Sequence, residues 1–265
     1  MEIEKLIDEG YETNEYRNKQ RLYIGASGIG NACLATVAFG FRGFPETPPA
    51  PKLRRIFRDG NRIESDVVKD LRQAGVHLLE NDPMSGKQWE FTAQGGHVIG
   101  HADGLIEEDE STILLEIKSM NDARWKKCKK EGVKYSDRHY WAQVQLMMGM
   151  AKISKTVFVF YNKNTSEYNS EVVEADEIEY ASLMAKAEAI MSGDVEKIAY
   201  NNDDWRCRGC FQRESCWEGR TPEPSQRSCA NARAEKDGSW SCSKGCHGTC
   251  KDWAAWAPKD RQAVV

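Results

Sequence analysis

The feature that most constrains the fold is the run GHADGLIEEDESTILLEIKSM, which occupies residues 100–120. It contains two segments of strand-like composition, and the acidic turn EEDES separates them. Because side chains alternate along a strand, Glu116 and Lys118 share one face while Ile117 points into the core. If the two strands pair through the turn, Asp103 converges on the face that carries Glu116 and Lys118.

Helical and strand periodicities surround this run. Helices are predicted at 27–39, 53–74, 140–153 and 175–193, and strands at 88–92, 97–106, 112–118 and 156–161. The first three strands are expected to be consecutive and antiparallel. This order of elements predicts an α/β core in which helices flank a central mixed β-sheet.

Cysteines divide the chain near residue 200. Of the nine cysteines, seven follow that position. We find no apolar leader and no run of about 18 apolar residues, so we expect a cytosolic protein without a membrane anchor. In such a protein, cysteines serve metal or redox chemistry more readily than disulfides. We expect a core at 1–200, a cysteine loop at 201–220 and a cysteine-rich, metal-binding tail at 221–265.

The carboxylates of Asp103 and Glu116 suit a hard divalent cation such as Mg²⁺ or Mn²⁺, with the carbonyl oxygen of Ile117 as a third ligand. Such an ion can activate a water molecule and stabilise charge on a phosphate. Lys118 could orient or deprotonate that water and offset the charge. A lone Glu-x-Lys pattern is most often a surface ion pair, so this prediction depends on the residues around it.

A basic segment follows the second strand and includes Arg124, Trp125, Lys126 and Lys127. The formal net charge of −4 gives no general electrostatic case for binding nucleic acid. This local run could nevertheless attract a phosphate backbone, and Trp125 could stack on an exposed base. A solvated helix face is the alternative.

Together these residues resemble the PD-(D/E)xK nuclease superfamily, in particular the RecB-like group of phage exonucleases and CRISPR-associated iron-sulfur nucleases. The resemblance covers residues 20 to about 217 and implies a restriction-endonuclease-like core. It implies that Glu64, on the helix before the sheet, is a further metal ligand. It also implies a catalytic role for Gln143, although Met147 stands where the group usually has a tyrosine.

Three cysteines at 207, 210 and 216 have the spacing C-x₂-C-x₅-C and can reach one metal centre. Zinc or a four-iron cluster requires a further ligand beyond Cys207, Cys210 and Cys216. In the iron-sulfur branch of the group, one N-terminal cysteine joins three C-terminal ones around a [4Fe-4S] cluster, which implies Cys33 as the fourth ligand. Zinc in the same pocket and unligated buried cysteines are the alternatives.

The tail carries a second set of soft ligands, namely Cys229, Cys242, Cys246, His247 and Cys250. With nearby glycines to permit tight turns, these residues resemble a second, zinc-binding knuckle. The spacing C-x₁₂-C-x₃-C-x₃-C is irregular, so a loosely ordered tail is equally compatible with the sequence.

The resemblance implies a DNA exonuclease or end-processing nuclease of phage-type recombination. Such an enzyme acts on single strands or duplex ends in the cytoplasm of a bacterial or phage-infected cell, with a single-strand annealing protein as its partner. One alternative is a CRISPR-adaptation nuclease of the same fold. Another is a non-cleaving DNA-binding metalloprotein, against which the intact Asp103, Glu116 and Lys118 argue.

Overall fold

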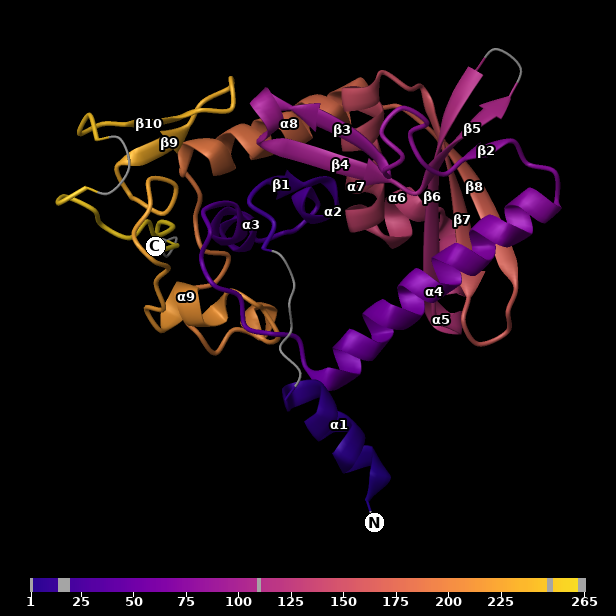
Figure 1. Ribbon diagram of the computed structural model, residues 1–265, viewed down its shortest axis with the longest axis horizontal. Helices are drawn as coiled ribbons and strands as arrows, with labels where there is room; N and C mark the ends of the chain where they lie inside the picture. The colour runs from indigo at the N-terminus through magenta and orange to yellow at the C-terminus, as the bar shows by residue number, and fades with distance from the viewer. Residues whose placement is uncertain (1, 14–19, 109–110, 247–249, 262–265) are drawn as a thin grey trace.

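A computed structural model describes residues 2–13, 20–108, 111–246 and 250–261 of the 265-residue chain. Within these residues the elements form a mixed α/β structure (Figure 1). No helix in this part of the chain combines the length and the apolar composition that a membrane crossing requires. The helices are α1 (Ile3–Thr13), α2 (Ala26–Ile29), α3 (Leu34–Phe41), α4 (Pro51–Gln73), η1 (Gln94–Gly96), α5 (Asp122–Glu131), α6 (Val133–Ser136), α7 (Arg138–Ala151), α8 (Glu177–Ser192), η2 (Trp205–Cys207) and α9 (Arg213–Trp217).

The largest sheet contains the strand that carries Glu116 and Lys118. Its strands, in spatial order, are β2 (Leu78–Leu79), β5 (Gly104–Glu108), β6 (Ser111–Met120), β7 (Lys155–Asn162) and β8 (Tyr168–Glu174). β6 and β7 are parallel, and the other neighbouring strands are antiparallel. The predicted central mixed sheet is therefore confirmed.

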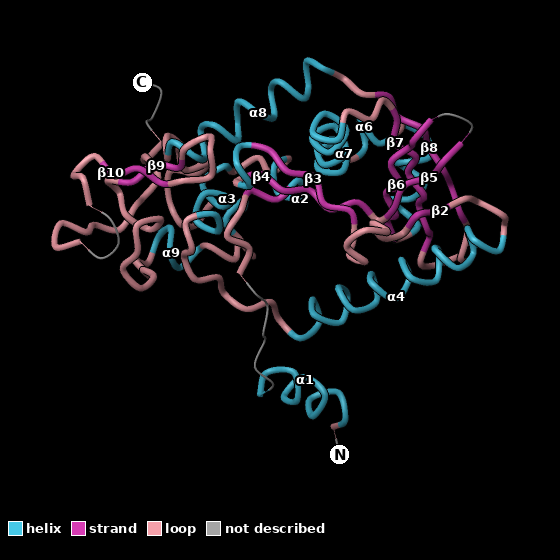
Figure 2. The backbone as a smooth tube through the Cα atoms, turned by 45° about the horizontal axis from the view of Figure 1, so that its top comes forward, coloured by secondary structure: helices cyan, strands magenta, loops and turns pink. Residues whose placement is uncertain are grey.

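Helices cover both faces of this sheet (Figure 2). α4 packs Ile63 and Val67 against Ile117 of β6. On the opposite face, beneath α7, Leu114 of β6 joins the main core. Because side chains alternate along the strand, Glu116 shares the face of Leu114 and Ile117 points toward α4. The predicted alternation along this strand is confirmed.

A smaller sheet has the order β1 (Ile24–Gly25), β4 (Val98–Ala102), β3 (Trp89–Ala93). The single strand predicted at 97–106 was wrong, because β4 ends before Asp103 and β5 begins after it, in the other sheet. A Cβ at Gly104 would lie 2.7 Å from Cδ1 of Leu78, so the absent side chain lets β5 pack against β2 directly after the bend. Asp103 thus lies where the chain crosses between two sheets.

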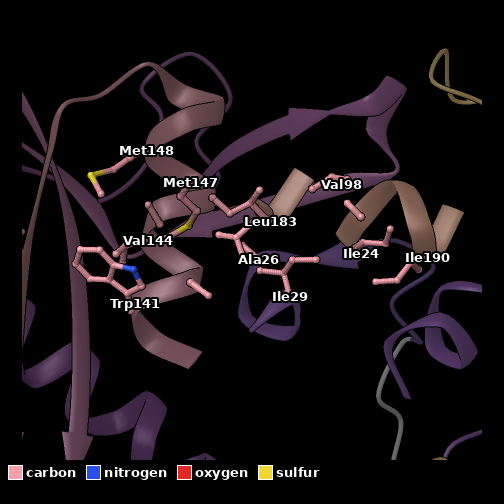
Figure 3. Close-up of a cluster of buried hydrophobic side chains, with 14 of the residues drawn as sticks. Ile24, Ala26, Ile29, Val98, Trp141, Val144, Met147, Met148, Leu183 and Ile190 are labelled. Atoms are coloured by element: carbon pink, nitrogen blue, oxygen red, sulfur yellow. The ribbon is translucent and has the colours of Figure 1, made fainter. Parts of the chain in front are cut away.

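The helix predicted at 27–39 is also divided, into α2 and α3. A Cβ at Gly30 would lie 2.8 Å from Cα of His139, so this glycine permits close contact with α7. The Asn31 side chain then accepts a hydrogen bond from the backbone N–H of Cys33, at 2.9 Å. Cys33 therefore precedes α3 instead of lying within a helix. Figure 3 shows apolar side chains of α2, β4, α7 and α8 packed together in the main core.

The tail is docked onto the core through Arg42, directly after α3. This guanidinium is fully buried and donates to the carbonyl oxygens of Arg227, Cys229 and Ala232 at 3.1 to 3.2 Å. It lies 5.4 Å and 4.9 Å from the ring centroids of Trp240 and Trp256. Next to it, strands β9 (Ala232–Ala234) and β10 (Trp240–Cys242) form an antiparallel pair. The described part of the tail is therefore packed, not loosely ordered.

Candidate active site

Asp103 and β6 are held together by the hairpin between β5 and β6. The register pairs Gly104 with Leu115, which places Asp103 beside the following residues of β6. One carboxylate oxygen of Asp103 accepts the backbone N–H of Ile117 at 2.7 Å. The structure therefore brings Asp103 to the strand that carries Glu116, as the sequence predicted.

Glu116 is the most buried carboxylate of this site, with 1% of its surface exposed. Its Oε1 accepts a hydrogen bond from Nε2 of Gln143 on α7 at 2.6 Å and pairs with the ammonium group of Lys118. Its other oxygen, Oε2, has no hydrogen-bond partner among the described residues. A buried carboxylate oxygen without a partner is costly, and a bound cation would remove that cost.

Lys118 lies above the ring of Tyr140, with Nζ 5.1 Å from the ring centroid. The guanidinium of Arg124 lies 5.4 Å from the same centroid and forms an ion pair with Asp137. The sequence prediction gave no role to Tyr140. Its position three residues before Gln143 was the available signal, because such residues share one face of a helix.

The pKa values of Glu116, Asp103 and Lys118 are all raised from their usual values. Burial raises the pKa of Glu116 to about 8, although the charge of Lys118 opposes the shift and Asp103 adds to it. Burial also raises the pKa of Asp103. Burial alone would lower the pKa of Lys118, but the carboxylates of Glu116 and Asp103 outweigh it and raise that pKa. Lys118 is therefore positively charged, and it faces two carboxyl groups, those of Glu116 and Asp103.

Glu64, on α4, completes this acidic group. Burial raises its pKa to about 7, and the negative charge of Asp103 raises it further while Lys118 lowers it. Its side chain lines two cavities, of about 480 Å³ and 1010 Å³, which meet at this point. Gln143 lines the smaller cavity and Lys118 the larger one.

The donor set fits a hard divalent cation. Mg²⁺ and Mn²⁺ prefer oxygen ligands such as the carboxylates of Glu64, Asp103 and Glu116 and the carbonyl oxygen of Ile117. Oε2 of Glu116 accepts no hydrogen bond from the described residues. Across the residues that the structure describes, no three His, Cys, Asp or Glu side chains already converge as an ion-binding set. Lys118 pairs with Glu116 instead, so metal binding requires small side-chain movements.

We predict that the stability of the metal-free protein falls as pH rises from about 5 to about 8. In the folded protein Glu64 keeps its proton up to about pH 7 and Glu116 up to about pH 8. An unfolded glutamate loses its proton near pH 4.3, so ionisation favours the unfolded chain. Mg²⁺ displaces these protons and should stabilise more at pH 8 than at pH 6. Thermal unfolding with and without Mg²⁺ measures both effects. Glu116→Gln should make the stability of the metal-free protein less dependent on pH. If Mg²⁺ stabilises the native protein equally at pH 6 and pH 8, Glu64 and Glu116 are not the ligands.

The basic segment lies on α5, and its residues do not act alike. Arg124 lines the larger cavity together with Lys118. Lys126 and Lys127 form ion pairs with Asp122 and Glu131, at 2.8 Å and 4.0 Å. Of the described residues in this segment, only Arg124 lines that cavity.

The predicted stacking of Trp125 on a base was wrong. Its side chain is buried, with 4% of its surface exposed, and Nε1 donates to the carbonyl oxygen of Phe160 at 3.3 Å. Trp125 and Cys128, three residues apart, form the buried face of α5. This spacing was the signal for burial in the sequence.

Four cysteines, Cys33, Cys207, Cys210 and Cys216, line one cavity of about 290 Å³. The hydroxyl of Thr36 lies 3.0 Å from the sulfur of Cys210. Burial raises the pKa of Cys216 to about 12; Lys197 opposes the shift, and the other three cysteines add to it. The structure therefore brings the predicted four cysteines around one space, although no three of them, in the described residues, converge on one point.

The tail cysteines are arranged differently. Cys246 and Cys250 form a disulfide, while Cys229 and Cys242 are free thiols. His247 lies outside the described residues. A zinc knuckle at these residues stays a prediction, and it requires that the disulfide be reduced, because zinc binds thiolates.

The sequence matches no family model and no curated protein. Among solved structures, it is similar to an alkaline exonuclease (LHK-Exo) from Laribacter hongkongensis, with TM-score 0.48 and 17% identity, covering 64% of this chain and 87% of that one. The same exonuclease in complex with dAMP gives TM-score 0.46 and 16% identity over 64% and 86% of the chains. A phage-related exonuclease from Haemophilus somnus 129PT gives TM-score 0.44 and 12% identity over 63% and 91%. The likeness is partial at these scores.

Proposed function

We propose that the protein is a metal-dependent nuclease that hydrolyses phosphodiester bonds of DNA. The observation that carries this proposal is the meeting of Asp103, Glu116 and Lys118, with a buried carboxylate oxygen that lacks a partner. A structural ion pair does not need a second and third carboxylate nearby, whereas a cation site does. The sequence resemblance supports the same chemistry.

Asp103, Glu116, Glu64 and the carbonyl oxygen of Ile117 would hold Mg²⁺ or Mn²⁺. When bound, such an ion activates water and neutralises charge on the phosphate. Gln143 holds the carboxylate of Glu116 in place through its hydrogen bond. Lys118 supplies a fixed positive charge beside the carboxylates, where it can orient the attacking water or stabilise charge on the phosphate.

The larger cavity favours a polymeric anion as substrate. Its lining includes four cations, Arg21, Lys118, Arg124 and Lys163, and two acids, Glu46 and Glu64. The residues that line this cavity therefore include more cations than acids, although the whole chain has a net charge of −4. We further propose that the protein acts as an exonuclease in phage-type recombination, with a single-strand annealing protein as its partner. The sequence resemblance supports this role.

The direct test is degradation of end-labelled linear single-stranded and duplex DNA, with Mg²⁺, with Mn²⁺ and with a chelator. Metal-dependent release of label from one end would support an exonuclease and give its polarity. Circular DNA serves as the control, since only an endonuclease cuts it. If the protein degrades none of these substrates with either metal ion, the proposed DNA nuclease activity is wrong.

We also propose that Cys33, Cys207, Cys210 and Cys216 hold a [4Fe-4S] cluster. The four residues line one cavity, and four cysteine thiolates are the ligand set of a four-iron cluster. The cluster would join the segment before α3 to the cysteine loop and stabilise the fold.

We predict that anaerobically purified protein is coloured, contains about four iron atoms per chain and loses most of this iron in Cys210→Ser. Iron analysis and visible absorption measure the change. Cys128→Ser is the matched control, because Cys128 is buried in the main core and not at the cavity. A colourless protein with one zinc ion per chain would favour the zinc alternative.

A further inference from the structure

An exposed apolar pair, Ile56 and Phe57, lies on α4 beside the candidate active site. Each side chain has 44% of its surface exposed, and both line the larger cavity together with Lys118. Farther along the same helix, Ile63 and Val67 are buried against the sheet. The first half of α4 therefore presents apolar surface to the cavity, and contiguous exposed apolar surface is a mark of binding sites.

The two kinds of lining residue come from different parts of the chain. The apolar residues come from the segment before α4, from α4 itself and from the cysteine loop: Pro48, Pro49, Ile56, Phe57 and Phe211. Lys118 comes from β6, Arg124 from α5 and Lys163 from the turn after β7. The cavity thus offers a ligand both apolar surface and positive charge.

From this lining we infer that the larger cavity binds single-stranded DNA, with unpaired bases against Ile56 and Phe57 and phosphates at Lys118, Arg124 and Lys163. This inference rests on the proposed nuclease function. A duplex exposes its phosphates but hides the faces of its bases, so the apolar residues would have no partner. A single strand exposes both, and it matches both kinds of residue.

The size of the cavity agrees with a strand. Its volume of about 1010 Å³ equals the upper end of pockets that hold one small ligand, about 300–1,000 Å³. More than one nucleotide can therefore lie in it. Glu64, which lines both this cavity and the second one, places a carboxylate beside the bound segment.

The test measures equilibrium binding of a fluorescently labelled thymidine oligonucleotide and of a duplex of equal length. Fluorescence anisotropy reports the binding, and a chelator in the buffer prevents cleavage. Native protein should bind the single strand more tightly. Phe57→Ala should weaken that binding roughly 5- to 100-fold, the usual effect of removing one stacking ring, and Phe57→Trp should retain it. Ile178→Ala is the matched control, since Ile178 is 84% exposed on α8 and should have no effect.

Every other outcome argues against the inference. Equal affinity for duplex and single strand, or a Phe57→Ala variant that binds like native protein, would overturn it. If Phe57→Ala instead changes the oligomeric state in sedimentation and leaves DNA affinity intact, the apolar pair contacts a second copy of the chain. If native protein cleaves DNA and Phe57→Ala cleaves it equally fast, the proposed single-strand site is wrong but the proposed nuclease activity stands. If Phe57→Ala weakens DNA binding but native protein shows no metal-dependent cleavage, the binding site stands and the proposed nuclease activity is wrong.

Discussion

Lys118→Ala should lower the rate constant of metal-dependent DNA cleavage by roughly two to three orders of magnitude, the usual effect of removing one charge-stabilising group from an active site. Lys118 is the cation paired with Glu116, and the carboxylates of Glu116 and Asp103 keep it protonated. Its loss removes the positive charge that we propose faces the scissile phosphate. Initial rates on end-labelled linear DNA measure the effect.

Lys236→Ala is the matched control for this substitution. Lys236 is an exposed lysine that pairs with Glu188 on α8 and lines none of the described cavities, so its removal should leave the rate near that of native protein. Because Lys118→Ala also leaves Glu116 buried beside no cation, thermal unfolding must show that the variant is folded. If folded Lys118→Ala cuts as fast as native protein, the site assignment fails and a DNA-binding protein without nuclease activity becomes the better explanation.

Arg42→Ala should lower the free energy of unfolding by about 3–5 kcal/mol, because truncation removes three hydrogen bonds to carbonyl oxygens of the tail and opens a cavity. Burial lowers the pKa of Arg42 to about 10. The buried guanidinium donates hydrogen bonds to the carbonyl oxygens of Arg227, Cys229 and Ala232. Urea unfolding measures the loss, and limited proteolysis should then cleave the tail first.

Arg58→Ala provides the comparison for Arg42→Ala. The side chain of Arg58 is 65% exposed and contacts Asp59, so its removal should change stability by less than about 0.5 kcal/mol. If Arg42→Ala costs no more than Arg58→Ala, the tail is not held to the core through this guanidinium.

Much of the site could be predicted because its residues are close in sequence. Glu116 and Lys118 share a face of one strand, and Asp103 reaches them through a hairpin; a period of two and a turn are both local signals. Gln143 and the four cysteines around the cavity lie far apart in the chain. Their grouping was predicted from the family resemblance, which carries long-range information that spacing alone lacks.

Other features were invisible to local patterns. The division of 97–106 between two sheets depends on the contact of Gly104 with Leu78, and the break before Cys33 depends on the contact of Gly30 with α7. In each case a residue distant in sequence decides the outcome.

The sequence by itself determined the mixed α/β class, the strand that carries Glu116 and Lys118, and the divalent-cation chemistry these residues suit, since each follows from the alternation or chemical type of nearby residues. Only the tertiary structure decided that Tyr140 lies under Lys118, that Arg42 holds the tail, and that Ile56 and Phe57 face the same cavity as the cations. These contacts join elements far apart in the chain. They exist only after the sheet and its helices have packed, because burial is a property of the assembled fold and not of a segment.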